Sequence, residues 1–175
     1  MRVLSDIALI FSILLVLTIA VTVIAHLFVP VVYVPTPRRI VERMVHAAKL
    51  RKGDIVYDLG AGDGRLLIAA KKKCPAIHAR GWELIPTIWL LSRMCAWWAG
   101  VKVDLRCGNA FTKDVSDADV IFLYLFPDVM ESLVWKFDRE LKPGTRVISH
   151  TFRFPKREAV EVIECEKKKV YVYRW

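Results

Sequence analysis

The stretch Val56-Tyr-Asp-Leu-Gly-Ala-Gly-Asp-Gly64 decides the fold, because it joins an apolar strand pattern to a glycine-rich turn just before a helical pattern. Gly60 and Gly62 let the backbone pass close to a ligand without a side chain in the way. The helix that follows offers free backbone N–H groups in its first turn. Because ligands of open α/β sheets bind where parallel strands end, the stretch predicts a binding site at that edge.

The spacing of the glycines argues against a pyrophosphate ligand. The turn has the pattern GxGxG, whereas the dinucleotide fingerprint is GxGxxG and would place its third glycine at Arg65. The Lys-Ser/Thr pair of a phosphate-binding P-loop does not follow the turn either. The sequence therefore favours a ligand without a pyrophosphate group.

The remainder of the chain alternates strand and helix patterns. Strands are predicted at 55–59, 78–84, 103–106, 119–126 and 145–152, and helices at 38–49, 63–73, 86–99 and 128–141. Two further segments, 159–165 and 170–173, alternate strictly and predict a closing antiparallel hairpin. This order predicts an α/β protein with a Rossmann-like, mostly parallel sheet of seven strands, covered by helices on both faces.

Two polar residues after later strands indicate a nucleoside ligand. Glu83 ends the second predicted strand, where a carboxylate can accept hydrogen bonds from both ribose hydroxyls. Asn109 follows the third strand and can hydrogen-bond to an adenine edge, with Ala110 and Phe111 against the ring face. Taken alone, Glu83 could also be a solvated strand end and Asn109 an ordinary turn residue.

A long apolar segment precedes this region. Ile7–Val29 contains 23 residues without Asp, Glu, Lys or Arg, and as a helix it would span roughly 35 Å. A cleaved signal peptide and a buried core helix are the alternatives, but the segment is long for the first and has no polar face for the second. It predicts a single-pass transmembrane anchor. Basic residues such as Arg38, Arg39 and Arg43 follow it and place the C-terminal domain on the cytoplasmic side.

The charge of the chain lies outside the apolar segment. The 27 Lys and Arg against 18 Asp and Glu give a formal charge of +9, and only Arg2 and Asp6 precede Pro30. This surface is either a solvated face or one attracted to anionic headgroups of a membrane. Nucleic acid is not expected as a partner, because no recognition motif accompanies the scattered basic residues. The four cysteines lack metal-site spacing, so no metal is predicted and reduced thiols are expected.

The motif Asp58–Arg65, together with Glu83 and Asn109-Ala110, resembles the class I (seven-β-strand) S-adenosylmethionine-dependent methyltransferases. One branch is more similar. Its members are the membrane-anchored protein-lysine methyltransferases of the ATP synthase c-subunit and the adenine nucleotide translocase, with their prokaryotic relatives. This closer resemblance is carried by the apolar segment and by Tyr33-Val-Pro-Thr36, Trp82–Pro86, Ser92-Arg93, Phe126-Pro127 and Arg153-Phe-Pro155.

The resemblance implies S-adenosylmethionine as the cofactor and assigns a role to each matching residue. Asp58, Gly60, Gly62 and Gly64 would shape the methionine and ribose pocket, and Glu83 would hold the ribose. Asn109 and Ala110 would meet the adenine, although many class I enzymes have Asp where this chain has Asn109. Tyr33, Pro35 and Thr36 would close over the cofactor. A rigid linker with a helix cap at Thr36 is the alternative for that segment.

The predicted catalytic pocket follows the fourth strand and consists of Tyr124, Phe126 and Pro127, with Asp128 near its lip. Methyl transfer to an amine needs alignment and exclusion of water rather than a covalent intermediate. An apolar pocket favours the neutral form of a lysine, and an aromatic ring can hold a methylammonium. The alternative is that Tyr124 and Phe126 are core residues of the strand. His150 is expected to be structural or else to accept a proton.

The sequence thus predicts a protein-lysine N-methyltransferase that acts on a membrane protein with an accessible lysine. Its expected organisation is an anchor at 1–29, a linker and lead-in helix at 30–52, and the methyltransferase domain at 53–175. A lipid-headgroup or small-amphiphile methyltransferase is a first alternative, since the same anchor and basic surface would serve it. A non-enzymatic membrane adaptor that binds S-adenosylmethionine is a second.

Overall fold

A computed structural model describes residues 2–28, 33–165 and 168–175. Its seven strands form one sheet in the order β3-β2-β1-β4-β5-β7-β6. The strands are β1 (Ile55–Leu59), β2 (His78–Glu83), β3 (Asp104–Cys107), β4 (Val120–Leu123), β5 (Arg146–His150), β6 (Glu161–Cys165) and β7 (Lys168–Arg174). Strands β1 to β5 pair in parallel, and β7 lies antiparallel between β5 and β6. The predicted Rossmann-like sheet with its antiparallel C-terminal hairpin is confirmed.

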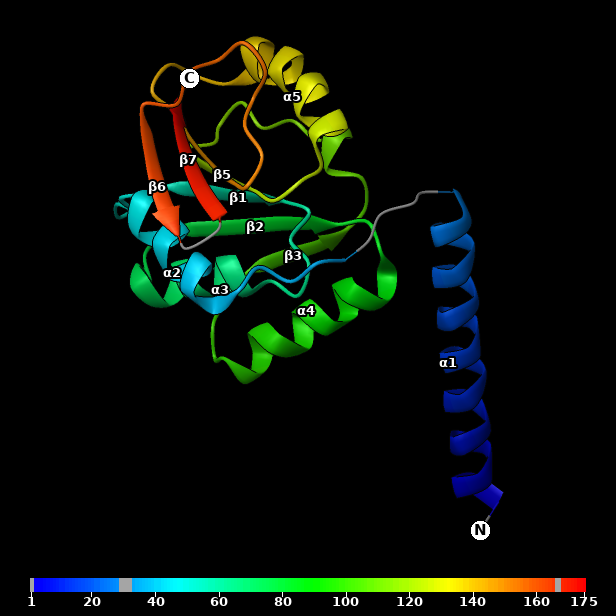
Figure 1. Cartoon of the computed structure of the whole chain (residues 1–175). Helices are drawn as coiled ribbons and strands as arrows, with labels where there is room; N and C mark the ends of the chain where they lie inside the picture. The colour runs from blue at the N-terminus through cyan, green and yellow to red at the C-terminus, as the bar shows by residue number, and fades with distance from the viewer. Residues whose placement is uncertain (1, 29–32, 166–167) are drawn as a thin grey trace.

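Helices cover both faces of this sheet (Figure 1). The helices along the chain are α1 (Arg2–Phe28), α2 (Arg38–Ala47), α3 (Arg65–Lys73), α4 (Pro86–Trp98), the short 3-10 helix η1 (Ala110–Thr112) and α5 (Pro127–Glu140). Helices α2 and α3 pack on one face, with α4 beside them, and α5 packs on the other. Helix α1 stands beside the domain, and its neighbour there is α4.

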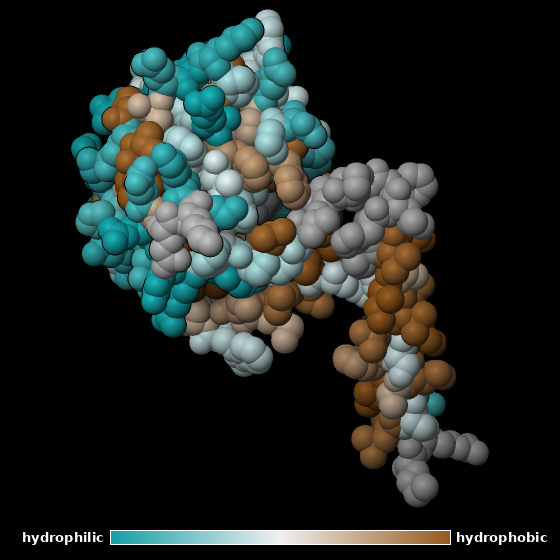
Figure 2. Space-filling model, in the orientation of Figure 1, coloured by the Kyte–Doolittle hydropathy of each residue, from teal (hydrophilic) through white to brown (hydrophobic). Residues whose placement is uncertain are grey.

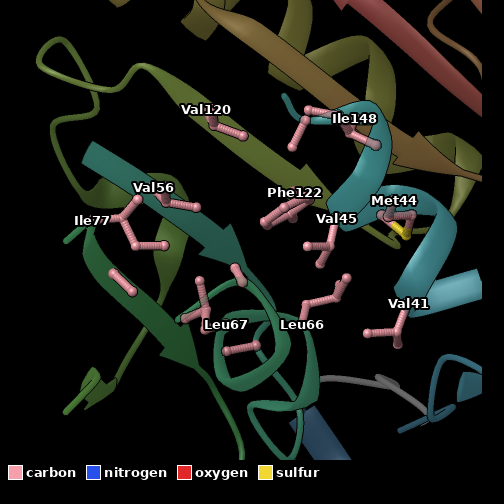
Figure 3. Packing of buried hydrophobic residues seen from close by; sticks show 14 of the residues in the cluster. Val41, Met44, Val45, Val56, Leu66, Leu67, Ile77, Val120, Phe122 and Ile148 are labelled. Atoms are coloured by element: carbon pink, nitrogen blue, oxygen red, sulfur yellow. The ribbon is translucent and has the colours of Figure 1, made fainter. Parts of the chain in front are cut away.

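Strand β1 shows why the sheet must be covered on both sides. Its side chains alternate, so that Val56 packs toward α2 and α3 while Tyr57 and Leu59 pack toward α5. All three are buried, as expected for a central parallel strand. Figure 3 shows Val56 in the first of these two cores, together with Met44 of α2 and other labelled side chains of α2, α3 and the sheet.

Several predicted boundaries are wrong, and the backbone explains each of them. The fourth strand was expected at 119–126 but ends at Leu123, because the chain leaves the sheet to reach Pro127, the first residue of α5. The helix expected from Asp63 begins at Arg65, since Gly64 has φ +79° and caps it. The helix expected to reach Lys49 ends at Ala47, and Lys49 itself has φ +46°.

Helix α1 contains the predicted apolar segment, apart from Val29, which lies outside the described residues. The window Val3–Val21 is long and apolar enough to cross a membrane, and none of it is buried against the domain. This lack of burial contradicts the alternative of a core helix, whose apolar side chains would be covered by the rest of the protein. The helix remains a candidate membrane span.

Gly81 in β2 is required for the close packing of the sheet on the glycine loop and α3. A methyl group at this position would lie 2.7 Å from Cβ of Ala61 and 2.8 Å from Cδ1 of Leu67. We expect Gly81→Ala to lower the free energy of unfolding by about 1–3 kcal/mol, because overpacking a dense core forces its neighbours apart. Urea denaturation of the full chain in detergent measures this loss.

The control for this prediction is the same substitution in a Leu67→Val background. Shortening Leu67 makes room for the added methyl group, so part of the loss should be recovered and the two effects should not add. An equal loss in both backgrounds would contradict the packing explanation.

Candidate active site

The glycine loop between β1 and α3 is held by the end of β2. The N–H groups of Gly60 and Ala61 both donate to the carbonyl oxygen of Trp82, at 3.0 and 2.9 Å. Gly60 and Gly62 have φ values of +96° and +55°, which side chains with a Cβ rarely adopt. The loop therefore turns away from the sheet at its carboxyl edge and leaves space above the strand ends.

Glu83 binds the loop through its side chain. One carboxylate oxygen accepts from the N–H of Gly62 at 2.9 Å, and the other accepts from the N–H of Ile85 at 2.9 Å. The side chain is buried, so these two bonds fix the orientation of the carboxylate. Each oxygen has lone pairs left for a further donor, as the predicted ribose contact requires.

Three carboxylates, those of Asp58, Asp63 and Glu83, gather around the loop. Burial raises the pKa of Asp58 well above its ordinary value, and the nearby charges of Glu83 and Asp63 raise it further. Burial also acts to raise the pKa of Asp63, but hydrogen bonds and the charge of Arg65 lower it overall. The cavity thus carries concentrated negative potential in a chain that is basic as a whole, which suits a cationic ligand.

The segment Tyr33–Thr36 lies against the loop from outside. A Cβ on Gly62 would come within 2.8 Å of Cε2 of the Tyr33 ring, so the ring occupies the space that this glycine leaves open. Arg65 joins the two parts, since one guanidinium nitrogen donates to the carbonyl oxygen of Thr36 at 2.7 Å and another pairs with Asp63 at 2.6 Å. The alternative of a cap at Thr36 is wrong, because the N-cap of α2 is Pro37 and no side chain caps it.

Asn109 is already engaged in the loop after β3. Its side-chain oxygen accepts from the N–H of Phe111 at 2.9 Å and so starts helix η1. The side-chain NH₂ group is the part that is left for an adenine ring nitrogen, whereas an Asp would offer a second acceptor there. Ala110 is buried and Phe111 is partly buried beside it, so both predicted ring contacts lie at the cavity.

A cavity of about 380 Å³ connects these parts, which is a size typical of small-molecule sites. The predicted site residues that line it come from five different segments of the chain: Tyr33, Pro35, Thr36, Asp58, Gly60, Gly62, Glu83, Asn109, Ala110, Tyr124 and Phe126. Two residues predicted for the site, Gly64 and Pro127, do not line the cavity. Gly64 caps α3 and Pro127 is the first residue of α5.

Aromatic rings form the end of the cavity beyond β4 and β5. The Tyr124 ring centroid lies 4.2 Å from that of His150, and the Phe152 ring centroid lies 6.3 Å from that of Tyr124 and 6.1 Å from that of Phe126. Phe126 is 46% exposed, so it stands at the surface rather than in a strand core. Burial, and then the charge of Lys168, lower the pKa of His150 to about 4. His150 is therefore neutral near pH 7 and a weak proton acceptor.

Comparison with known proteins agrees with this geometry. Residues 58–161 match the family model described as the ANTKMT methyltransferase domain. A protein-lysine N-methyltransferase of Saccharolobus islandicus is 40% identical over 153 residues, which are 83% of this chain and 95% of that protein. The chain belongs to this methyltransferase family.

More distant relatives of this methyltransferase are longer proteins. The adenine nucleotide translocase lysine N-methyltransferase of mouse is 33% identical, over 81% of this chain and 62% of that protein. The lysine N-methyltransferase of the human ATP synthase c-subunit is 34% identical, over 70% of this chain and 52% of that protein. The chain thus spans nearly all of the archaeal relative and about half to three fifths of these mammalian ones.

A solved structure from Salinibacter ruber, described as an RNA methyltransferase in complex with S-adenosyl-L-homocysteine, has 37% sequence identity and a TM-score of 0.77. It covers 81% of this chain and 93% of that chain. The predictions of a class I methyltransferase fold, of S-adenosylmethionine as cofactor and of membership among the protein-lysine methyltransferases are confirmed.

The residues present in this methyltransferase fit the cofactor. Gly60 and Gly62 line the cavity without side chains, and the Glu83 carboxylate is held by two backbone N–H groups but keeps lone pairs for a further donor. The acidic wall around Asp58 complements a cation. When bound, S-adenosylmethionine supplies a methyl group on a positively charged sulfur. The rings of Tyr124 and Phe126 line the same cavity as Glu83.

Sequence reasoning did not include Asp63, Arg65 and Phe152 among the site residues. Asp63 and Arg65 stand within the quoted motif, but only the fold brings the N-terminal segment to Arg65. Phe152 follows β5, far from Tyr124 in sequence, and no local pattern links the two rings.

Asp58→Asn should stabilise the ligand-free protein and weaken cofactor binding. The folded pKa of Asp58 is raised, so this group contributes stability at low pH that is lost as pH rises through that pKa. Asn does not titrate, so the unfolding free energy of the variant should fall less between acidic and neutral pH. The loss of a charged partner should raise the Kd for S-adenosylmethionine about tenfold or more.

Asp63→Asn is the matched control, because the pKa of Asp63 is lowered in the folded protein. Its contribution to stability is present at neutral pH and is lost on acidification, so this variant should be less stable than wild type at pH 7. Thermal unfolding between pH 4 and pH 8 measures both. The same pH dependence in both variants would contradict the assignment.

Arg65→Gln should release the segment Tyr33–Thr36 and weaken cofactor binding with the fold intact. The side chain is about one third exposed, so we expect a modest cost of ~1 kcal/mol, or a Kd about fivefold higher. Calorimetry measures the Kd. Arg38→Gln is the control, because Arg38 is 95% exposed and only 3.8 Å from Glu42. An equal change in both variants would exclude the specific contact.

Proposed function

We propose that this methyltransferase transfers methyl groups to the ε-amino group of lysine in a protein held in a membrane. The observation that carries the proposal is the pair of aromatic side chains, Tyr124 and Phe126, in the wall of the cofactor cavity, with the Phe152 ring next to both. It is supported by the names of the relatives, which are lysine methyltransferases of the ATP synthase c-subunit and the adenine nucleotide translocase.

The chain's residues perform two tasks in this proposal. The loop and Glu83 hold the cofactor, so the position of the transferred methyl group is set by β1 and β2. The rings after β4 and β5 receive the lysine and exclude water around its amine. Burial of a lysine disfavours its charged form, so the amine enters the reaction with a free lone pair.

Alignment accounts for the rate in this scheme, and no side chain has to form a covalent intermediate. Asp128, in the first turn of α5, is exposed and stands in the chain between Phe126 and Val129, which line the cavity, so it would attract the lysine ammonium before it enters. The rings of Tyr124 and Phe126 pack against the lysine side chain and hold the methylated, positively charged amine by cation–π attraction. His150 is a positioning residue in this proposal, because its neutral imidazole packs on Tyr124.

Membrane anchoring by α1 completes the proposal. The span Val3–Val21 would cross the bilayer once, and the basic residues after it favour the cytoplasmic side for the catalytic domain. Anchoring confines enzyme and acceptor to the same surface, which raises their effective concentration.

RNA is the second candidate acceptor, because the structure from Salinibacter ruber is described as that of an RNA methyltransferase. The chain lacks the Asn/Asp-Pro-Pro-aromatic tetrapeptide of enzymes that methylate amides and adenine. Its cavity ends in Tyr124 and Phe126, which suit an alkylammonium better than a nucleobase edge that needs hydrogen bonds.

Radiolabelled S-adenosylmethionine tests the function. The purified full chain is incubated with membranes from cells that lack it, and the label is then separated into protein, RNA and lipid fractions. We expect label in a protein band that yields methyl-lysine after hydrolysis. Glu83→Ala should abolish this label, because the carboxylate contributes to cofactor binding.

Each other outcome rejects the proposal in a distinct way. Label in the organic phase alone would indicate a lipid-headgroup acceptor, and label in nucleic acid would indicate RNA. No label in any fraction, with S-adenosylmethionine binding confirmed by calorimetry, would support a binding adaptor.

A further inference from the structure

Helix α4 presents an apolar surface that its own domain does not cover. Leu90, Leu91, Met94, Trp97 and Trp98 are all exposed, and the two tryptophans are 77% and 72% exposed. Exposed apolar patches of this kind on a folded domain mark surfaces that meet a partner or a membrane. We refer to these five side chains as the α4 face.

The α4 face lies on one side of the helix. At about 100° per residue, its five members fall within an arc of roughly 120°. Ser92 and Ala96, the buried residues of α4, fall on the opposite side and pack against the domain. Arg93 is the single charged residue of this helix and lies at the edge of the arc, with its guanidinium 5.4 Å from the Trp89 ring.

The position of α4 relates this face to the candidate membrane span. Among the described elements, α4 is the part of the domain that neighbours α1, and it lies on the side toward which α1 extends (Figure 1). In the space-filling view, apolar colour on this side of the domain lies beside the apolar α1 (Figure 2). A bilayer crossed by α1 would therefore meet the α4 face.

The surroundings of Trp97 are basic. A hollow of about 890 Å³ beside it has four basic side chains in its wall: Lys71, Arg80, Arg93 and Lys102. The same wall has two acidic side chains, Asp104 and Asp117, of which Asp104 pairs with Arg80 at 2.7 Å. Four basic against two acidic side chains leave the wall with a net charge of 4 − 2 = +2. The hollow is therefore positively charged and complements anionic headgroups.

We propose that the α4 face is a second membrane contact, which inserts into the headgroup region of an anionic bilayer and holds the domain against it. Tryptophan suits this depth, since its ring is apolar and its N–H remains near water. The inference rests on the proposed anchoring by α1. Because α4 begins next to Ile85, which lines the cofactor cavity, the contact would bring the active-site opening to the bilayer surface.

A lipid surface is favoured over a protein partner by three features together. Helix α4 neighbours α1, the α4 face ends in two adjacent exposed tryptophans, and the hollow beside Trp97 is basic. A second copy of this chain would bring a like-charged hollow against the first and would not place α1 and α4 on a common plane.

Quenching of tryptophan fluorescence tests the contact. The full chain is reconstituted in vesicles of equimolar phosphatidylcholine and phosphatidylglycerol whose acyl chains carry bromine near the headgroups. We expect bromine to quench wild-type emission, and Trp97→Phe/Trp98→Phe to lose most of this quenching. Trp135→Phe is the matched control, because Trp135 is 74% exposed on α5, on the opposite face of the sheet, and should leave the quenched component unchanged.

A charge-reversal variant tests whether the contact requires anionic headgroups. Lys102→Glu should reduce the quenching of Trp97 and Trp98 in the anionic vesicles. It should have little effect in pure phosphatidylcholine, because only anionic headgroups attract the positively charged hollow. Co-sedimentation with the vesicles, measured in the same samples, reports anchoring by α1 separately from the α4 contact.

Three outcomes would overturn the inference. One is equal quenching in wild type and Trp97→Phe/Trp98→Phe. Another is quenching that is absent although the chain sediments with vesicles. The third is a tryptophan signal that depends on protein concentration rather than on lipid, which would make the α4 face an interface between copies. A chain that does not sediment at all would reject the anchoring as well, whereas failure to methylate lysine would leave the quenching result unaffected.

Discussion

The end of β2 holds the glycine loop, and the geometry of the site depends on this attachment. The carbonyl of Trp82 accepts two backbone N–H groups of the loop, and the carboxylate of Glu83 accepts a third. Without Glu83, the N–H of Gly62 would be left in the cavity wall without that partner, which is costly. The same attachment sets where α3 begins and how closely Gly81 packs beneath it. A change in this attachment would therefore affect both the cofactor pocket and the packing of the sheet.

Electrostatic potential divides the molecule into two regions of opposite sign. The cavity gathers Asp58, Asp63 and Glu83 in a chain with a formal charge of +9. A buried carboxylate such as Asp58 costs stability until a cation pairs with it, which is typical of binding sites. Apart from Arg65, which pairs with Asp63 in the cavity wall, the basic residues of the described chain lie outside this cavity. The acidic cavity therefore complements a cationic cofactor, and the basic surface complements anionic headgroups.

The N-terminal segment connects the candidate membrane span to the cofactor cavity. The segment from Tyr33 to Thr36 leads from α1 and passes over the glycine loop, where Arg65 holds it. The element that ties the domain to its candidate span is therefore also part of the cofactor cavity wall. In the proposed function, this arrangement keeps the cavity close to acceptors in the same bilayer.

Local sequence determined the order of strands and helices, because the buried apolar strands and the glycine turn after β1 are patterns of neighbouring residues. Glu83 and Asn109 were found for the same reason, since each directly follows or ends a strand and strand ends share one edge of the sheet. The helix beginning at Arg65 was placed two residues early, because hydrophobic periodicity does not report positive φ at Gly64.

Tertiary structure decided which distant residues meet. Arg65 reaches Thr36 and Phe152 reaches Tyr124 only after the sheet has formed, and neither contact has a local signal in the chain. The α4 face was hidden in the sequence for a related reason. Apolar residues on a helix predict a core, and only the packing of the domain shows that Trp97 and Trp98 face outward. Sequence patterns report what neighbouring residues prefer, whereas burial depends on the whole fold.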